Sequence, residues 1–77
     1  MIPPAQREHL EAQKRKRLYI RISTAEREMG WKPSAHRACI RNLTRGQKES
    51  MRELSLGMLI RLDKAIAGRL RAFRRGR

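Results

Sequence analysis

The stretch from Ser55 to Arg77 constrains the fold most, because its residues separate into an apolar and a basic side when placed on a helix. At about 100° per residue, its large apolar side chains share one arc, and most of its cations lie nearly opposite. The apolar set is Leu59, Leu62, Ile66, Leu70 and Phe73, and the basic set is Arg61, Lys64, Arg71 and Arg75. Asp63 is the only acid after Glu53, so no nearby acid is expected to neutralise the basic set. This pattern predicts an amphipathic helix that seals a small core with one side and displays positive charge on the other.

Positive charge dominates the composition of this short chain. Its 77 residues hold 20 Lys and Arg against 7 Asp and Glu, a net charge of +13. Charge of one sign at this density repels itself in a compact state and attracts polyanions, of which nucleic acid is the most abundant. An acidic protein surface and an anionic membrane are the alternative polyanions. The length allows one small domain whose core is mostly aliphatic, since the chain has one Trp, one Tyr and one Phe.

The segment before Gly30 predicts a helix whose first half is mostly solvated. Residues 5–17 contain good helix formers but only one large aliphatic side chain, Leu10. From residue 18 onward, apolar residues recur at helical spacing on one face. These positions are Leu18, Ile22, Ala25 and Met29. Gly30 then supplies a helix stop, and Pro33 confirms the break.

Capping signals divide the rest of the chain into helices. Ser34 is a suitable N-cap for a short second helix that ends near Leu43. Ser50 and Glu53 fit a capping box that starts one helical turn, and Ser55 then caps the last helix. We therefore predict an all-α fold, a small three-helix domain with a short extra helical turn before the last helix.

The predicted domain carries a basic segment at each end. Residues 1–17 are expected to form a basic N-terminal extension that is helical, residues 18–73 the compact helical domain, and residues 74–77 a flexible basic tail. The run Lys14-Arg15-Lys16-Arg17 ends the first segment, and like charges this close together destabilise an isolated helix. A bound polyanion would relieve that repulsion.

Few residues of this chain can catalyse a reaction at neutral pH or bind a soft metal. The candidates are His9, His36 and Cys39. His36 and Cys39 can share a helical face, but a zinc site usually needs more ligands, and a Cys–His pair needs a third group to orient it. A lone cysteine forms no internal disulfide, so Cys39 is interpreted as a small core residue. We expect no catalytic residue, no metal and no cofactor, and hence a protein that is not an enzyme.

Two groups of cations, one toward each end of the chain, are the main candidates for phosphate contact. Each Lys or Arg that neutralises a phosphate releases counterions, so binding would weaken steeply with salt. Outward-facing cations of the short middle helix add a weak candidate for a recognition helix. The predicted nucleic-acid-binding residues are Lys14, Arg15, Lys16, Arg17, Arg21, Arg37, Arg41, Arg61, Lys64, Arg71, Arg74 and Arg75. Duplex DNA is favoured because so few aromatic residues offer little surface for stacking single-stranded bases.

A membrane or a protein is the alternative partner for the same helices. No apolar run reaches the roughly 18 residues of a membrane span, and the first residues lack the hydrophobic region of a signal peptide. A cytoplasmic location without a membrane partner is therefore expected. The last helix is basic and amphipathic, as membrane-surface helices are, but its apolar side is needed to seal the domain. Tyr19, Trp31 and Phe73 could anchor a protein partner, and packing in the core or at helix ends is their favoured role.

Six short stretches between Leu18 and Leu62 together resemble a known family. They read Leu18-Tyr19-Ile20-Arg21-Ile22, Arg27-Glu28-Met29-Gly30-Trp31, His36-Arg37-Ala38, Leu43-Thr44-Arg45-Gly46, Ser50-Met51-Arg52-Glu53-Leu54-Ser55 and Leu59 to Leu62. In this order and spacing they are similar to the GemA-like early regulatory proteins of Mu-type transposable phages. The resemblance implies a small phage protein that alters host or phage gene expression, linked in Mu to effects on host DNA topology. Arg45 interrupts the Thr-Gly-Lys piece of that family, and its members are generally longer.

The leading hypothesis is a non-enzymatic nucleic-acid-binding regulator, with DNA favoured, that acts as a phage early regulator of host or phage gene expression. Its expected location is the cytoplasm of a bacterial host cell. The alternative is a phage-encoded inhibitor or adaptor that binds an acidic host protein. The two hypotheses use the same exposed cations, and they differ in whether a stoichiometric protein partner survives treatment with nuclease.

Overall fold

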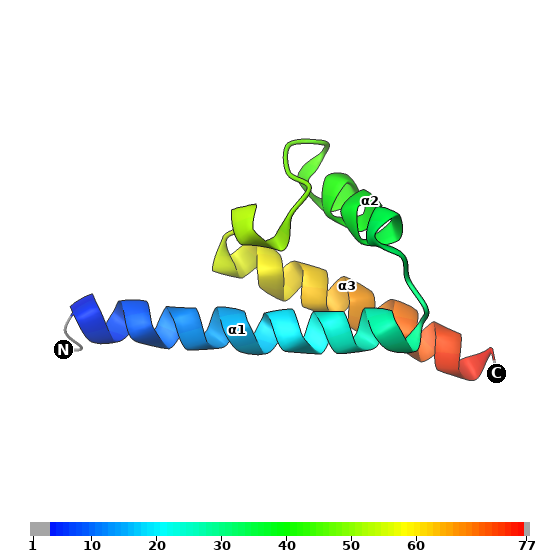
Figure 1. Ribbon diagram of the computed structural model, residues 1–77, viewed down its shortest axis with the longest axis horizontal. Helices are drawn as coiled ribbons and strands as arrows, with labels where there is room; N and C mark the ends of the chain where they lie inside the picture. Colours follow the sequence, from blue (N-terminus) through cyan, green and yellow to red (C-terminus); the bar gives the residue numbers. More distant parts are fainter. Residues whose placement is uncertain (1–3, 77) are drawn as a thin grey trace.

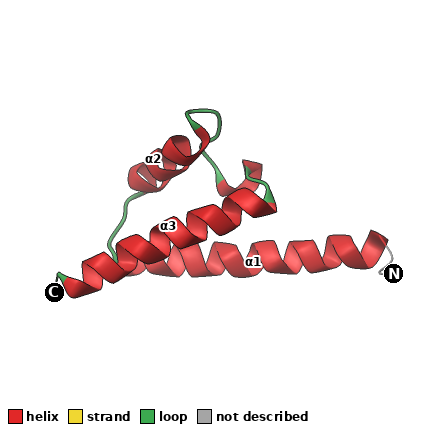
Figure 2. Ribbon diagram, turned by 180° about the vertical axis from the view of Figure 1, so that it is seen from behind, coloured by secondary structure: helices red, strands yellow, loops and turns green. Residues whose placement is uncertain are grey.

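The computed structural model describes residues 4–76, and every regular element within them is helical (Figures 1 and 2). The elements are α1 (Pro4–Glu28), α2 (Pro33–Thr44), the short 3₁₀ helix η1 (Met51–Glu53) and α3 (Leu56–Arg75). This arrangement confirms the predicted all-α fold with three helices and a short helical turn before the last one.

Helices α1 and α3 lie side by side and run in the same direction. Contacts between them follow the order of the chain: Arg21 of α1 pairs with Asp63 of α3, and Glu28, further along α1, pairs with Arg74, further along α3. Helix α2 provides the return connection that a parallel pair requires, and it lies over α3 on the side away from most of α1 (Figure 1). The body is elongated, with extents of 48 × 26 × 16 Å.

The long helix α1 projects beyond the start of α3. Residues 6–13 are all exposed, and this part of α1 has no other element beside it in Figure 1. The chain passes from this projecting part into the packed part without a break, so the structure has no boundary in the backbone between residues 17 and 18. The projecting part and the packed part of α1 therefore form one continuous helix.

The core lies where α3 meets the second half of α1 and the inner side of α2. Its fully or nearly fully buried apolar residues are Ile22, Cys39, Ile40, Leu54, Leu59, Leu62 and Ile66. Leu59, Leu62 and Ile66 confirm the apolar side predicted for the last helix, and Cys39 is a core residue as interpreted. Phe73 is 38% exposed, because the last turns of α3 extend past the end of α1 (Figure 1).

The ends of α1 and α2 follow different capping rules. Gly30 adopts a φ of 72°, in the left-handed region, and the Trp31 amide donates to the carbonyl of Glu26 at 2.9 Å, as the predicted glycine stop requires. At the start of α2, the prediction of Ser34 as N-cap was wrong. The cap position is Lys32, whose side chain makes no capping hydrogen bond. Pro33 takes the first position of the helix, where its fixed φ fits and its missing N–H has no cost.

The serine caps before α3 confirm the prediction in part. The Ser55 hydroxyl accepts from the Met58 amide at 3.2 Å, so it caps α3 as predicted. The Ser50 hydroxyl accepts from the Arg52 amide at 3.3 Å and starts η1. The carboxylate of Glu53 accepts from the Glu49 amide rather than from that of Ser50, so the predicted capping box is only half formed.

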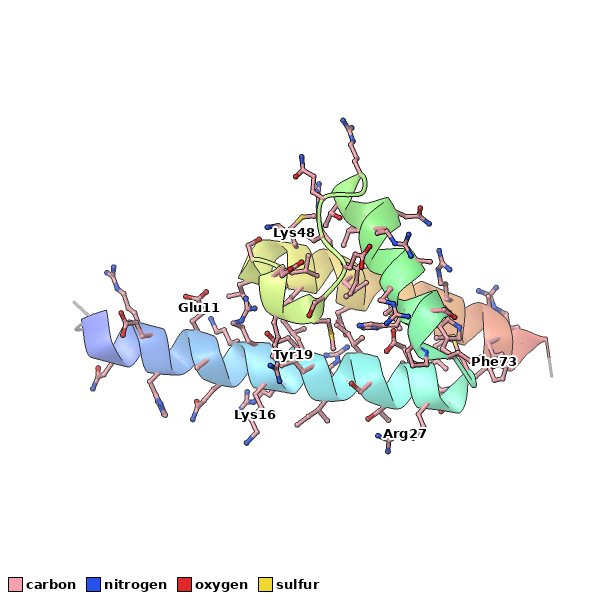
Figure 3. All side chains as sticks on the ribbon, turned by 45° about the horizontal axis from the view of Figure 1, so that its top comes forward. Glu11, Lys16, Tyr19, Arg27, Lys48 and Phe73 are labelled. Carbon is pink, nitrogen blue, oxygen red and sulfur yellow. The ribbon has the colours of Figure 1, made fainter. Side chains whose placement is uncertain are left out.

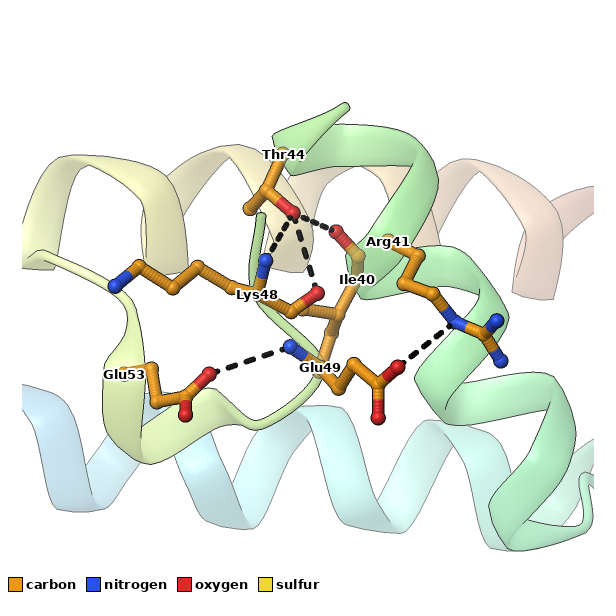
Figure 4. Close-up of polar contacts among 6 residues, drawn as sticks. All are labelled: Ile40, Arg41, Thr44, Lys48, Glu49 and Glu53. Carbon is orange, nitrogen blue, oxygen red and sulfur yellow. Dashed lines mark hydrogen bonds and ion pairs between the residues drawn. The ribbon is translucent and has the colours of Figure 1, made fainter. Parts of the chain in front are cut away.

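The loop between α2 and η1 is organised by one buried hydroxyl (Figure 4). Thr44 Oγ1 accepts from the Lys48 amide at 3.0 Å, and it lies 2.9 Å from the Ile40 carbonyl and 3.2 Å from the Lys48 carbonyl. These bonds close the turn in which Arg45 and Gly46 have left-handed backbones. The loop then returns the chain to α1, where the carbonyls of Met51, Arg52 and Leu54 meet the Arg15 guanidinium.

Candidate nucleic-acid interface

Two adjacent hollows follow one side of the line along which α1 and α3 meet, which we call the seam. The N-terminal hollow, of about 280 Å³, is lined by Lys14, Arg17, Leu18, Arg21, Leu56 and Ile60. The C-terminal hollow, of about 290 Å³, is lined among others by Ile20, Arg21, Glu28, Asp63, Leu70 and Arg74. Arg21 lines both, so the two hollows are neighbours along the seam, and the ion pair of Arg21 with Asp63 lies where they meet. The seam therefore combines cations of α1 with apolar side chains of both helices.

Two cations at the N-terminal end of the seam are exposed and uncompensated. Lys14 and Arg17 are one helical turn apart on α1. Neither forms an ion pair with any acid in residues 4–76. Both project from a helix that Leu18 and Ile22 anchor in the core. Their position is thus set by α1, and their charge is available to a ligand.

The outer side of α3 carries the second group of uncompensated cations. Its members are Arg61, Lys64, Arg71 and Arg75, which are all exposed. None of the four forms an ion pair within the described part of the chain, as expected from the sequence. Arg61 directs one guanidinium nitrogen to the Met58 sulfur at 4.0 Å. Because Leu59, Leu62 and Ile66 hold the opposite side of α3 in the core, these cations face solvent.

Two predicted contact residues are instead neutralised across the seam. Arg21 Nη2 lies 3.3 Å from Asp63 Oδ2, and Arg74 forms a bidentate pair with Glu28 at 2.7 and 2.9 Å. The hydrogen bonds from Arg74 to this carboxylate raise the pKa of its guanidinium, and the charge of Glu28 adds to the effect. Arg74 and Arg75 belong to α3, with Gly76 at its cap, and Arg77 lies outside the described residues. Helix α3 thus includes the first two residues of the segment 74–77, and the flexibility expected of that segment stays a prediction.

The remaining predicted cations lie apart from the seam. Lys16 projects from the side of α1 that faces away from α2 and α3, as does Arg27, which was not among the predicted contacts (Figure 3). On α2, Arg37 is exposed, and Arg41 Nε lies 3.5 Å from Glu49 Oε1 (Figure 4). The structure therefore does not join the cations of α2 and of the far side of α1 to those of the seam.

Arg15 is the one predicted phosphate contact that the structure places in the body of the protein. Its guanidinium donates to the Leu54 carbonyl at 2.7 Å and to the Tyr19 hydroxyl at 2.8 Å. It also approaches the carbonyls of Met51 and Arg52 at 3.4 Å. These bonds engage Nη1 and Nη2 and give Arg15 a role in the fold, and its assignment to phosphate binding stays a prediction.

Two arginines cover aromatic rings that could otherwise stack on bases. Arg15 lies over Tyr19, 5.6 Å from the ring centroid, and Arg69 lies over Trp31 at 5.5 Å. Sequence reasoning did not single out Arg69. Its spacing of seven residues after Leu62 was the available signal, since this spacing returns to the same side of a helix.

The histidine and cysteine of α2 do not form a catalytic pair. His36 Nδ1 makes a short contact with the carboxylate of Glu26 on α1, which ties α1 to α2. No hydrogen bond joins His36 to Cys39 in the described structure. Burial raises the pKa of the Cys39 thiol, Arg69 lowers it, and Glu26 adds a smaller upward effect. A buried thiol with a raised pKa stays protonated near neutral pH and is a poor nucleophile.

Comparisons with protein family models, with curated proteins and with solved structures found no match to this chain. Among the described helices, none has a stretch that is both long and apolar enough to cross a bilayer. Within the same residues, no three His, Cys, Asp or Glu side chains come together as a possible metal site. The charge and shape of the helical surface are therefore the features that bear on function.

Proposed function

We propose that this protein binds nucleic acid without catalysing a reaction, prefers duplex DNA, and acts as a regulator. The observation that carries the proposal is a set of exposed cations on two packed helices, none of them paired with a described acid. The set consists of Lys14, Arg17, Arg61, Lys64, Arg71 and Arg75. No acid that the structure describes compensates the charge of these cations. Their binding to a phosphate backbone is favourable because it releases the small counterions that the phosphates hold.

The preference for duplex DNA is supported by two of the three aromatic residues, whereas the third, Phe73, is 38% exposed. Tyr19 and Trp31 are half-buried and are each covered by an arginine. Single-stranded binding proteins use exposed aromatic rings as stacking platforms, and these two rings are committed elsewhere. Phosphate contact without base stacking favours a regular duplex, which holds its phosphates in fixed rows.

The proposed role is that of an early phage regulator, which is what the resemblance to the GemA-like family implies. A protein that contacts phosphates without reading bases would act by occupancy or by altering DNA shape rather than by recognising one operator. This mode of action is compatible with an effect on DNA topology.

The test is a salt titration of binding to duplex DNA, single-stranded DNA and RNA of equal length. If all six cations contact phosphate, the slope of log K against log salt for duplex DNA is about −5. The double variant Lys14→Gln/Arg17→Gln should flatten that slope by about two. The double variant Lys16→Gln/Arg27→Gln makes the same charge change on the far side of α1 and should flatten it much less.

Two results would contradict the proposal. One is the absence of binding to any nucleic acid at low salt. The other is an equal loss of slope in both double variants, which would show that net charge alone drives association. Recovery of one stoichiometric acidic protein from nuclease-treated lysate, with no binding to purified DNA, would favour the adaptor hypothesis.

A further inference from the structure

The seam between α1 and α3 holds exposed aliphatic side chains that phosphate binding does not use. Ile20 is 57% exposed at the C-terminal hollow, and Ile60 is 42% exposed at the N-terminal hollow. Single exposed aliphatic residues are common on protein surfaces. Here both line neighbouring hollows on one side of the seam, and the lining of these hollows also includes Leu18, Leu56 and Leu70. A nucleic acid backbone has no apolar face to cover them.

The length and shape of the seam match a helix. On α3 the lining runs from Leu56 to Arg74, which at 1.5 Å per residue is about 27 Å, or five helical turns. Two helices lying side by side leave a groove into which the side-chain ridge of a third helix can pack. The third element of this fold, α2, packs on α3 through Cys39 and Leu43, next to Leu62 and Ala65. The seam side is therefore left without a covering helix in the described structure.

The charges around the seam select an acidic partner. Its two acids are already paired, Asp63 with Arg21 and Glu28 with Arg74. Lys14 and Arg17 at its N-terminal end have no acidic partner within residues 4–76. A second copy of this chain would bring a net charge of +13 to a surface of the same sign. A partner with carboxylates beside an apolar stripe would complement the seam, because the carboxylates would pair with the cations and the stripe would cover the aliphatic side chains.

We propose that the seam binds an acidic amphipathic helix of a partner protein. The apolar stripe of that helix covers Ile20 and Ile60, and its flanking carboxylates pair with Lys14 and Arg17. This inference does not depend on the proposed binding to DNA. Because both ligands use Lys14 and Arg17, the acidic helix and DNA compete for the protein when both are present.

The experiment uses the full chain and a synthetic probe of known structure. The probe is a labelled peptide of about 18 residues, five helical turns, with leucines at alternating three- and four-residue spacing and glutamates on both flanks. A scrambled peptide of identical composition has the same charge but no apolar stripe. We expect the amphipathic peptide to bind at least about tenfold more tightly by fluorescence anisotropy, because only it buries the aliphatic side chains of the seam.

Substitutions distinguish specific binding at the seam from non-specific electrostatic attraction. Ile20→Gln/Ile60→Gln should weaken peptide binding by about tenfold and leave the affinity for duplex DNA unchanged. Leu10→Gln makes the same kind of change at an exposed leucine outside both hollows, and it should leave peptide affinity unchanged. Lys14→Gln/Arg17→Gln should weaken both ligands. Circular dichroism checks that each variant stays folded, and amide chemical shifts of the unmodified protein map the peptide to the seam without any substitution.

Four results would overturn the inference. The two peptides could bind equally, which would make the seam a general polyanion surface. Ile20→Gln/Ile60→Gln could leave peptide affinity unchanged, or the shift changes could centre on α2, which would move the site elsewhere. Sedimentation equilibrium could show a dimer that Ile20→Gln/Ile60→Gln dissociates, which would assign the seam to a second copy. Binding of DNA is measured separately, so failure of either proposal leaves the other standing.

Discussion

Arg15 on α1 donates a 2.7 Å hydrogen bond to the backbone carbonyl of Leu54, 39 residues further along the chain. The same guanidinium reaches the carbonyls of Met51 and Arg52 and the hydroxyl of Tyr19. Leu54 is 3% exposed and follows η1 directly. One arginine therefore fixes the start of α3 on α1 and donates to carbonyls at the end of η1, of which that of Met51 also accepts from the Leu54 amide at 3.1 Å.

Replacing Arg15 should destabilise the fold rather than weaken DNA binding selectively. Arg15→Ala removes charge-assisted hydrogen bonds to backbone carbonyls, so we expect the free energy of unfolding to fall by about 1.5–3 kcal/mol. Arg15→Lys should not restore it, because an ammonium cannot reach several carbonyls from one planar fork. Urea unfolding measures the effect, and Lys16→Ala, at the neighbouring exposed position, is the control with little change. Equal stability of Arg15→Ala and Lys16→Ala would contradict the role assigned to Arg15.

The sequence contained part of the information needed to place Arg15. Arg15 precedes Leu18 by three residues and Ile22 by seven, so it shares the buried face of α1. Within the run of cations from Lys14 to Arg17, helical periodicity therefore singles out one member that points inward. Its acceptors could not be predicted, because they depend on where η1 lies relative to α1 in the folded chain.

Local signals predicted the helices, and tertiary arrangement decided the ion pairs. The apolar side of α3, the glycine stop at Gly30 and the cap at Ser55 follow from residues close in sequence. The pairing of Glu28 with Arg74 joins residues 46 positions apart, and it depends on α1 and α3 being parallel. Helical patterns alone do not distinguish a parallel from an antiparallel pair, so the neutralisation of Arg74 could not be read from the sequence.

Ile22 and Ile20 offer a matched test of the core. Ile22 is fully buried and Ile20 is 57% exposed, although they stand two residues apart on the same helix. We expect Ile22→Ala to lower the free energy of unfolding by about 2–5 kcal/mol, which is enough to unfold so small a domain. Ile20→Ala should change it by only about 0.5 kcal/mol. Thermal and urea unfolding measure both variants, and similar losses in the two would contradict the placement of α1.

The buried hydroxyl of Thr44 should stabilise the loop after α2. Thr44→Val keeps the shape of the side chain but leaves the Lys48 amide without its acceptor (Figure 4). The expected cost is about 1–3 kcal/mol of unfolding free energy, with faster amide exchange at Lys48. Thr24→Val, at an exposed position of α1, is the matched control and should have little effect. Unchanged exchange at Lys48 in Thr44→Val would show that the loop is held by other contacts.

Cys39 should make the stability of the protein depend on alkaline pH. Burial raises the pKa of this thiol in the folded state, so the folded protein disfavours the thiolate more than the unfolded chain does. The contribution of Cys39 is fully present below the ordinary thiol pKa of about 8.5 and is lost as the pH rises above it. We expect stability to fall between about pH 8 and about pH 10 in the natural protein and to fall less in Cys39→Ala. The free energy of unfolding of both proteins is measured with urea over this pH range. An equal fall in the natural protein and in Cys39→Ala would contradict this expectation.

Removing the charge of Glu28 should add one cation to the nucleic-acid-binding surface. In the folded protein Arg74 is held by a bidentate pair with this carboxylate, and its charge is compensated. Glu28→Gln releases Arg74 on a helix that already displays Arg71 and Arg75, so one further phosphate can be contacted. We expect tighter binding to duplex DNA and a salt slope steeper by about one. Exposed pairs contribute little to folding, so the thermal stability should change only slightly.

The control for Glu28 is Glu8, an exposed acid on the projecting part of α1 that forms no described ion pair. Glu8→Gln makes the same change in net charge without releasing an arginine, so it should raise the affinity slightly through the overall field and leave the salt slope nearly unchanged. Fluorescence anisotropy with labelled duplex DNA over a range of salt concentrations measures both slopes. If Glu8→Gln steepened the slope as much as Glu28→Gln, net charge and not the release of Arg74 would control the interaction.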